Sequence, residues 1–332
     1  MLINAVMNVI KMIKVKNLRK YFPIKGGFLN KKLGDVKAVE NINFEIPEGE
    51  ILGLVGESGS GKTTLGRSII RLIEPSEGEI LYNNKNIMNF NNKEMRALRK
   101  EFQIIFQDPF ASLDPRKKIF DIIAQGLKIH TSMNREEVNK KVISTIKEVG
   151  LQEEHLGRYP HEFSGGQRQR IGIARALVLN PKFIIADEPV SALDVTIQAQ
   201  ILNLILELKE KYSLTILFIS HDLSVINQIA DKVMVMYLGH IVEMASTKNL
   251  FSNPRHPYTK SLIETAPQIF RKNKNKVLLK GDIPSPINPP SGCVFRTRCP
   301  NPTHDCKEGN IKMGLIEVSP DHWVDQCCVN CS

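Results

Sequence analysis

Short apolar runs recur along residues 12–250, and stretches with apolar residues at helical spacing separate them. The runs at 51–55, 183–186 and 215–219 are continuous, which is typical of strands buried on both faces. A hairpin is expected at 233–244, where two further apolar runs flank Leu238 and Gly239. Alternating strands and helices predict an α/β fold whose core sheet is largely parallel, with right-handed crossovers.

The pattern before residue 93 predicts short strands. Residues 12–15 and 39–46 alternate in polarity, whereas the glycine-containing segment 22–37 between them reads as a loop. A further strand is expected at 79–82, followed by an Asn-rich turn region at 83–92.

Residues 93–165 change character and predict a helical subdomain inserted into the α/β core. Only the short run 104–106 has the composition of a buried strand there. Helical spacing continues beyond the insertion. The predicted helices are 93–99, 116–127, 134–149, 151–158, 167–179 and 196–211.

A glycine-rich stretch follows the first continuous apolar run and matches the pattern G-x-x-x-x-G-K-[ST] of a phosphate-binding loop. Its glycines permit a tight turn with several N–H groups pointing inward, and the next helix directs its positive end at the same place. Lys62 would contact the β- and γ-phosphates of a nucleotide, and Thr63 would offer a hydroxyl to Mg²⁺. The stretch consists of Gly56, Glu57, Ser58, Gly59, Ser60, Gly61, Lys62, Thr63 and Thr64.

Two carboxylates end the apolar run at 183–186, as the second half of a phosphate-loop ATPase requires. Asp187 can hold Mg²⁺, and Glu188 can orient or deprotonate the attacking water. A second glycine-rich turn precedes the helix at 167–179 and lacks a lysine. It consists of Ser164, Gly165, Gly166 and Gln167, after Phe163.

This second turn resembles the signature motif of the ATP-binding-cassette (ABC) family, and the other family motifs follow in order. Gln107 resembles the Q-loop glutamine that meets Mg²⁺ and water, the stretch 191–194 with Asp194 resembles the D-loop, and His221 resembles the switch histidine. An aromatic residue before the first core strand stacks on adenine in this family, and spacing favours Phe22 over Tyr21.

The resemblance implies a phosphate-loop ATPase in which two cassettes hold ATP and Mg²⁺ head to tail. The phosphate loop of one cassette then faces the Ser164–Gln167 turn of the other. Glu188, His221 and Gln107 are the expected catalytic residues, and Thr63, Gln107 and Asp187 are expected around Mg²⁺.

The charge and the length of the apolar runs restrict the possible partners and location of the protein. Lysine and arginine exceed aspartate and glutamate by 45 − 35 = 10, but no interleaved aromatic pattern accompanies the basic residues, so no nucleic-acid partner is expected. No apolar run reaches the roughly 18 residues needed to cross a bilayer. Residues 1–10 lack the features of a signal peptide. These features predict a soluble protein or one that is peripheral to a membrane.

All six cysteines lie after residue 290, beyond a proline-rich stretch that reads as a linker. Disulfides are rare in the cytosol, so clustered cysteines favour a metal site or cluster. The spacing C-x5-C-x6-C-x20-C joins Cys293, Cys299, Cys306 and Cys327, with Cys328 and Cys331 as alternatives for the last. Four thiolates can hold a [4Fe–4S] cluster, and zinc and metal-free thiols are the alternatives. The cluster is what the resemblance of this tail to the peptide-importer ATPases, described next, implies.

The tail at 253–299, with 107–116 and 159–163, resembles the F-type ATPases of the oligopeptide and dipeptide importers (Opp and Dpp) over residues 13–328. That resemblance implies an ABC ATPase domain at 12–250 and a C-terminal region at 251–332. It also implies a D-type partner ATPase, two membrane permeases, an extracellular peptide-binding protein and a place on the cytoplasmic side of the cell membrane. A nickel or other metal importer, and a soluble ABC ATPase, are the alternatives.

Overall fold

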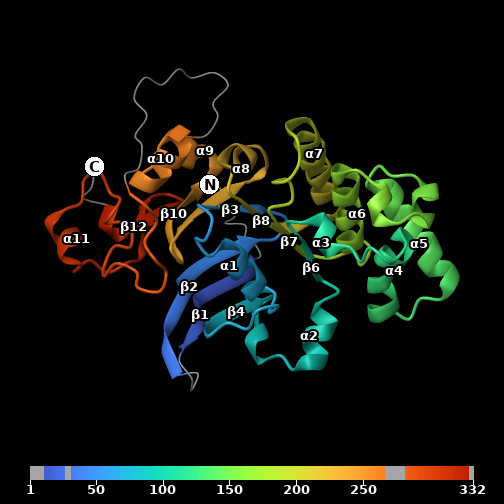
Figure 1. Ribbon diagram of the computed structural model, residues 1–332, viewed down its shortest axis with the longest axis horizontal. Helices are drawn as coiled ribbons and strands as arrows, with labels where there is room; N and C mark the ends of the chain where they lie inside the picture. The colour runs from blue at the N-terminus through green and yellow to red at the C-terminus, as the bar shows by residue number, and fades with distance from the viewer. Residues whose placement is uncertain (1–10, 27–30, 266–280, 329–332) are drawn as a thin grey trace, which may run out of the picture.

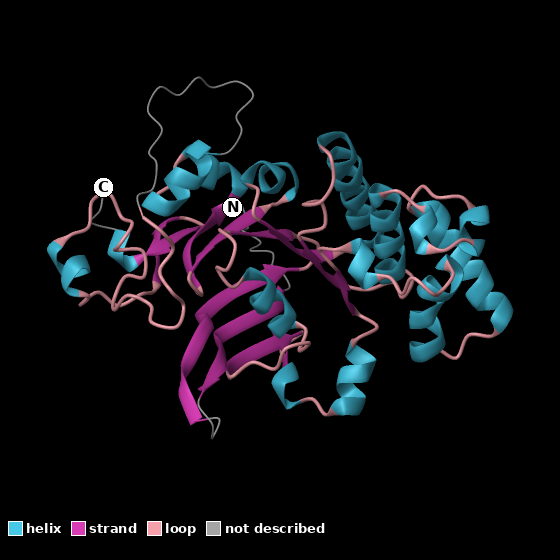
Figure 2. Ribbon diagram, viewed as in Figure 1, coloured by secondary structure: helices cyan, strands magenta, loops and turns pink. Residues whose placement is uncertain are grey.

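The computed structural model describes residues 11–26, 31–265 and 281–328. Within these ranges the chain forms an eight-stranded mixed sheet and a four-stranded antiparallel sheet (Figures 1 and 2). The helical subdomain lies at one end of the larger sheet and the C-terminal segment at the other (Figure 1). The N-terminal ten residues, the basic stretch 271–276 and Cys331 fall outside the described ranges.

The core of the larger sheet is parallel, as the apolar runs predicted. Its parallel strands lie in the order β9, β3, β8, β7, β6. Alternate residues of β3 face two different hydrophobic clusters: Ile51 and Val55 face one, and Leu52 and Leu54 the other. Burial on both faces therefore explains the continuous apolar composition. The bounds are β3 Ile51–Val55, β6 Phe102–Ile105, β7 Phe183–Asp187, β8 Thr215–Ser220 and β9 Lys232–Tyr237.

Three antiparallel strands complete this sheet, which makes it mixed. The predicted hairpin is present, because β10 (His240–Ser246) pairs with β9. The sequence did not reveal that β12 (His322–Asp325) pairs with β10 and β11 (Leu315–Ser319) with β12. The C-terminal segment thus extends the core sheet and is more than a linker followed by a tail.

The smaller sheet corrects the reading of residues 22–37 as a loop. Strands β1 (Lys11–Gly26) and β2 (Lys31–Pro47) form a long ribbon that pairs as far as Gly26 and Lys31. The outer part of this ribbon is mostly exposed or half-buried, so its residues lack the apolar alternation by which a half-buried strand is recognised. The sheet is completed by β4 (Glu77–Tyr82) and the two-residue β5 (Lys85–Asn86).

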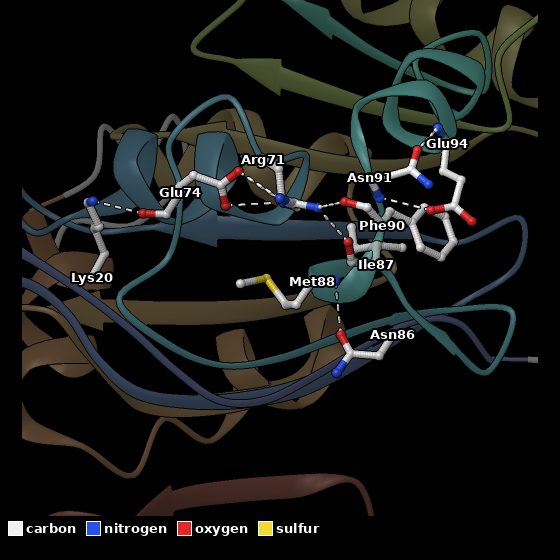
Figure 3. Close-up of polar contacts among 9 residues, drawn as sticks. All are labelled: Lys20, Arg71, Glu74, Asn86, Ile87, Met88, Phe90, Asn91 and Glu94. Atoms are coloured by element: carbon white, nitrogen blue, oxygen red, sulfur yellow. Dashed lines mark hydrogen bonds and ion pairs between the residues drawn. The ribbon is translucent and has the colours of Figure 1, made fainter.

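Helix α1 (Lys62–Ile69) contacts strands of both sheets. After α1 ends, Arg71 ties the chain to the predicted turn region, because its guanidinium donates to the carbonyl oxygens of Ile87 and Phe90 at 2.7 and 3.1 Å (Figure 3). Glu74 accepts three further bonds from Arg71, at 2.8, 3.1 and 3.2 Å. The turn region contains β5 and a short 3-10 helix at Ile87–Asn89.

The helical subdomain is present, with most helices close to their predicted positions. Asn91 and Asn134 start α2 and α5 through capping boxes with Glu94 and Glu137. The helix predicted at 151–158 is wrong: only the 3-10 helix Glu153–Gly157 forms after Gly150, whose φ is +74°. The helices of this region are α2 Asn92–Leu98, α3 Pro109–Ser112, α4 Ile119–His130, α5 Arg135–Glu148 and α6 Gly165–Leu177.

The remaining helices pack around the core sheet and the C-terminal segment. They are α7 Val195–Tyr212, α8 Leu223–Ile229, α9 Thr247–Ser252, α10 Pro257–Thr265 and α11 His304–Glu308. Among the described residues, none of the helices combines the length and apolar character that crossing a membrane requires.

Candidate active site

The phosphate loop joins β3 to α1, and its close packing explains two of its glycines. A Cβ at Gly56 would lie 2.1 Å from the carbonyl oxygen of Met236, and one at Gly61 would lie 2.1 Å from that of Ala38. Gly61 also caps α1 with φ +105°, in the left-handed region. Neither position has room for a side chain, so the loop can take this course only with glycine there.

Lys62 and Thr63 begin α1 and point back toward the loop and toward β7. The Lys62 ammonium donates to the carbonyl oxygens of Gly56 and Glu57 at 2.7 and 2.9 Å. Lys62 is 4% exposed, and its burial lowers the pKa of the ammonium. The Thr63 hydroxyl donates to Asp187 Oδ1 at 2.9 Å. The loop therefore presents a desolvated cation and a hydroxyl–carboxylate pair side by side.

Asp187 and Glu188 follow each other at the end of β7 and point in different directions. Asp187 is fully buried, and this burial raises the pKa of its carboxyl group. Glu188 has φ +47°, a left-handed conformation that costs roughly 1–3 kcal/mol for a residue with a side chain. Its Oε2 accepts a bond from Gln107 Nε2 at 3.0 Å and lies 3.1 Å from His221 Nδ1. The unusual backbone turns this carboxylate toward the two side chains.

Most of these groups line a cavity of about 510 Å³; Asp187 is not part of the lining and lies behind Thr63, whose hydroxyl it binds. Gln107, Glu188 and His221, which are far apart in sequence, line it together with residues of the phosphate loop. Sequence reasoning missed Val36, Ala38 and Pro286, which come from β2 and from the proline-rich stretch. The full lining is Val36, Ala38, Ser58, Gly59, Gly61, Lys62, Thr63, Thr64, Gln107, Glu188, His221 and Pro286.

Several predicted residues do not line this cavity. Ser164 caps α6, where its Oγ accepts from Gln167 N at 3.4 Å, and Asp194 caps α7 by accepting from Ile197 N at 3.0 Å. Gly166 packs so closely that a Cβ would lie 2.5 Å from Ile197. Phe22 lies opposite Val36 in the β1–β2 pairing and is 37% exposed, which puts it on the same sheet face as a lining residue.

Helix α3, which follows Gln107, contacts α6, the helix that Ser164 caps. Arg175 of α6 donates to the carbonyl oxygen of Ser112, which ends α3. The Arg168 guanidinium lies 3.6 Å from the centroid of the Phe110 ring. Sequence reasoning missed both arginines, because nothing in their local pattern distinguishes them from other basic residues of a helix. These two contacts tie the segment after Gln107 to helix α6.

The cysteines gather in the C-terminal segment. Cys293, Cys306 and Cys327 are at most 4% exposed, and Cys299 is half-buried. Cys327 Sγ lies 3.2 Å from Cys293 Sγ and 3.5 Å from Cys328 Sγ. His256, Cys327 and Cys328 also hold ligand atoms within 4.8 Å of one another. Cys306 accepts a bond from the Thr303 hydroxyl at 3.1 Å.

A phosphate loop that faces a strand-end carboxylate pair, a glutamine and a histidine defines the ATPase site of an ABC cassette. Residues 39–191 match the family described as ABC transporter, and residues 242–306 match the oligopeptide/dipeptide transporter C-terminal region.

Relatives agree with these matches. The chain is 51% identical to the oligopeptide transport ATP-binding protein AppF of Bacillus subtilis, over 94% of this chain and 95% of that protein. It is 50% identical to the dipeptide transport ATP-binding protein DppF of Haemophilus influenzae, over 88% and 89%. The dimeric post-hydrolysis structure of the ATP-binding cassette MJ0796 with ADP and Pi is similar, with a TM-score of 0.63 and 30% identity over 71% of this chain and 99% of that one. The protein belongs to the ABC transporter family of ATP-binding subunits.

Proposed function

We propose that this protein hydrolyses ATP as the energy-coupling subunit of an importer for oligopeptides or dipeptides. The observation that carries the proposal is the cavity in which Gln107, Glu188 and His221 meet the phosphate loop. Supporting it, the relatives described above are named for oligopeptide and dipeptide transport. The alternatives of a metal importer and a soluble ABC ATPase find no support in those relatives.

The proposed roles follow from the contacts. Lys62 neutralises the β- and γ-phosphates of ATP, with the N–H groups of the loop around them. Thr63, Asp187 and Gln107 would hold Mg²⁺, which supplies charge neutralisation on the phosphates. Glu188 accepts a proton from the water that attacks the γ-phosphorus, while the bond from that phosphorus to the bridging oxygen breaks and ADP leaves. His221 contacts the γ-phosphate, and Phe22 stacks on adenine.

A second cassette would complete the site. The Ser164–Gln167 turn lies away from this chain's own cavity, so its capped helix start is available to a sister subunit's ATP. The D-loop at 191–194 is mostly exposed, and Val195, which follows it at the start of α7, is 81% exposed. We infer that the sister is a related D-type ATPase. We also place the cassette at residues 12–250 and the C-terminal region at 251–332.

The membrane permeases would contact the Gln107 side of the helical subdomain, on the cytoplasmic face of the membrane. Phe110 is 63% exposed there, and Tyr159 is 37% exposed. Arg168 connects the segment around Phe110 with the segment around Tyr159. It lies over the Phe110 ring and donates to the carbonyl oxygen of Pro160 at 2.6 Å. An extracellular binding protein would deliver the peptide to the permeases.

Uptake by the reconstituted transporter tests this function. Proteoliposomes containing this subunit, its partner ATPase, both permeases and the binding protein should accumulate a labelled dipeptide or oligopeptide only when MgATP is supplied on the ATPase side. ATP-dependent accumulation of Ni²⁺ without peptide uptake would contradict the proposed cargo.

We further propose that Cys293, Cys299, Cys306 and Cys327 hold a [4Fe–4S] cluster. Supporting this proposal, Cys293, Cys306 and Cys327 are buried and Cys299 is half-buried in the same C-terminal segment, and four thiolates are the usual ligands of such a cluster. A bound cluster would act structurally, by tying together a segment rich in proline.

Protein purified without oxygen should then contain iron and acid-labile sulfide in equal amounts. Replacing Cys293 by Ser should remove both and lower the melting temperature. Comparing Cys327→Ser with Cys328→Ser identifies the fourth ligand. Two results would contradict the cluster: purified protein that contains zinc in place of iron, or wild-type protein that contains no metal and has the same melting temperature as Cys293→Ser.

A further inference from the structure

The C-terminal segment reaches the phosphate loop through an ion pair. Arg298 donates from Nη1 to Glu57 Oε2 at 2.7 Å and from Nη2 to Glu57 Oε1 at 3.1 Å. The side chain of Arg298 is 7% exposed and that of Glu57 28%. This two-point geometry fixes the carboxylate in orientation as well as position. Glu57 directly follows Gly56, so the pair holds the first turn of the loop.

A second contact from the same side holds the backbone of Glu57. Its N–H donates to the Tyr258 hydroxyl at 2.8 Å. Tyr258 lies on α10 and is fully buried in a cluster of rings, with Tyr237 at 4.9 Å and Phe295 at 5.6 Å between centroids. Because Phe295 lies three residues before Arg298, the ring cluster and the ion pair belong to one packed unit.

Glu57 passes these restraints to the lysine of the loop. Its carbonyl oxygen accepts a bond from Lys62 Nζ at 2.9 Å, so its carboxylate, N–H and carbonyl groups each have a fixed partner. The proline-rich stretch approaches the same cavity, where the carbonyl oxygen of Pro286 accepts a bond from Lys37 N at 3.3 Å and Pro286 is part of the lining. The segment beyond residue 280 thus meets the nucleotide cavity at two places.

We propose that Arg298 is a positioning residue for ATP: through Glu57 it holds the phosphate loop in the shape that binds the β- and γ-phosphates. The C-terminal region therefore sets the nucleotide affinity of the cassette. This inference rests on the proposed role of the loop and Lys62 in holding ATP. Without the pair, the first turn of the loop must be ordered by the nucleotide itself, which weakens binding.

Equilibrium binding of MgATP and steady-state hydrolysis by the full chain in the assembled transporter test this role. Arg298→Ala should weaken ATP binding and raise KM by about 5- to 50-fold, which is within the usual range of about 5- to 150-fold for coupling between sites. At saturating ATP, kcat should stay within about threefold of wild type, because the groups around Glu188 are untouched. Arg298→Lys should give an intermediate affinity, since an ammonium cannot make the two-point contact.

Arg296→Ala is the matched control for the integrity of the segment. Arg296 donates to the carbonyl oxygens of Cys306 and Lys307 at 3.3 and 3.0 Å and bonds no residue of the phosphate loop among its described contacts. Its ATP affinity should stay within about threefold of wild type. Adding Glu57→Gln to Arg298→Ala should weaken binding no further, because both changes break one pair.

The outcomes separate the two proposals. Wild-type ATP affinity in Arg298→Ala, or an equal loss in Arg296→Ala, would overturn the positioning role while leaving the proposed function intact. A wild-type protein that does not bind ATP would overturn the proposed function and this inference together.

Discussion

Replacing Glu188 by Gln should lower kcat for ATP hydrolysis by about 10²- to 10⁴-fold, the usual contribution of a general base. The amide oxygen can still accept the bond that Gln107 Nε2 makes at 3.0 Å, so the cavity should keep its shape. The amide cannot take a proton from water. ATP should therefore bind and remain unhydrolysed, and the two cassettes should stay associated around it.

Phosphate release in the assembled transporter measures the loss of hydrolysis, and binding of MgATP should match wild type. Glu207→Gln, which changes an exposed carboxylate on α7, is the control and should leave phosphate release unchanged. If Glu188→Gln retains more than about a tenth of the wild-type kcat, Glu188 is not the general base.

Replacing Lys62 by Met should weaken MgATP binding by about 10- to 100-fold, as expected when charged hydrogen bonds worth about 1.5–3 kcal/mol are lost. The methionine keeps the aliphatic part of the side chain, so the packing of the loop should survive. Stability without nucleotide should change little, because the substitution removes a buried charge, whose pKa burial lowers, together with the two hydrogen bonds that this charge donates to Gly56 and Glu57.

Titration calorimetry gives the affinity, and thermal unfolding without nucleotide gives the stability. Lys140→Met, on the exposed face of α5, controls for the loss of one positive charge. Undiminished ATP binding by Lys62→Met would show that the phosphates do not lie where the loop predicts.

The parts of the site that could be predicted are those whose chemistry restricts the residue type. Gly56 and Gly61 are required because backbone carbonyls fill the space of a side chain, and Lys62, Asp187 and Glu188 because phosphate and Mg²⁺ demand charge. The core strands could also be predicted, because burial on both faces of the sheet requires a continuous apolar run in the sequence. The α/β phosphate-loop fold followed from these features, and the resemblance of the ordered motifs to the ABC family implied the cassette.

Other parts depend on long-range contacts that leave no local pattern. The outer ribbon of β1 and β2 is held by backbone pairing with little burial, so its residues resemble a loop. Arg298 is one basic residue among several in the sequence. Only its ion pair with Glu57, 241 positions away, distinguishes it from the others. The pairing of β12 with β10 likewise joins distant segments, and Pro286 reaches the cavity only because the C-terminal segment folds back.

The central claim, that ATP is held between the Lys62 loop and a Ser164-type turn of a sister subunit, is tested most directly by the mass of the cassettes in MgATP. The Glu188→Gln protein with its partner cassette should sediment as a dimer in MgATP and as monomers without nucleotide. Ser164 of this chain faces the ATP of the sister subunit, so adding Ser164→Asp should weaken the dimer by placing a new charge against that γ-phosphate. Ser164→Asn should largely retain it, since both residues cap a helix well. A dimer whose dissociation constant is the same with and without Ser164→Asp, at the same ATP concentration, would contradict the claim.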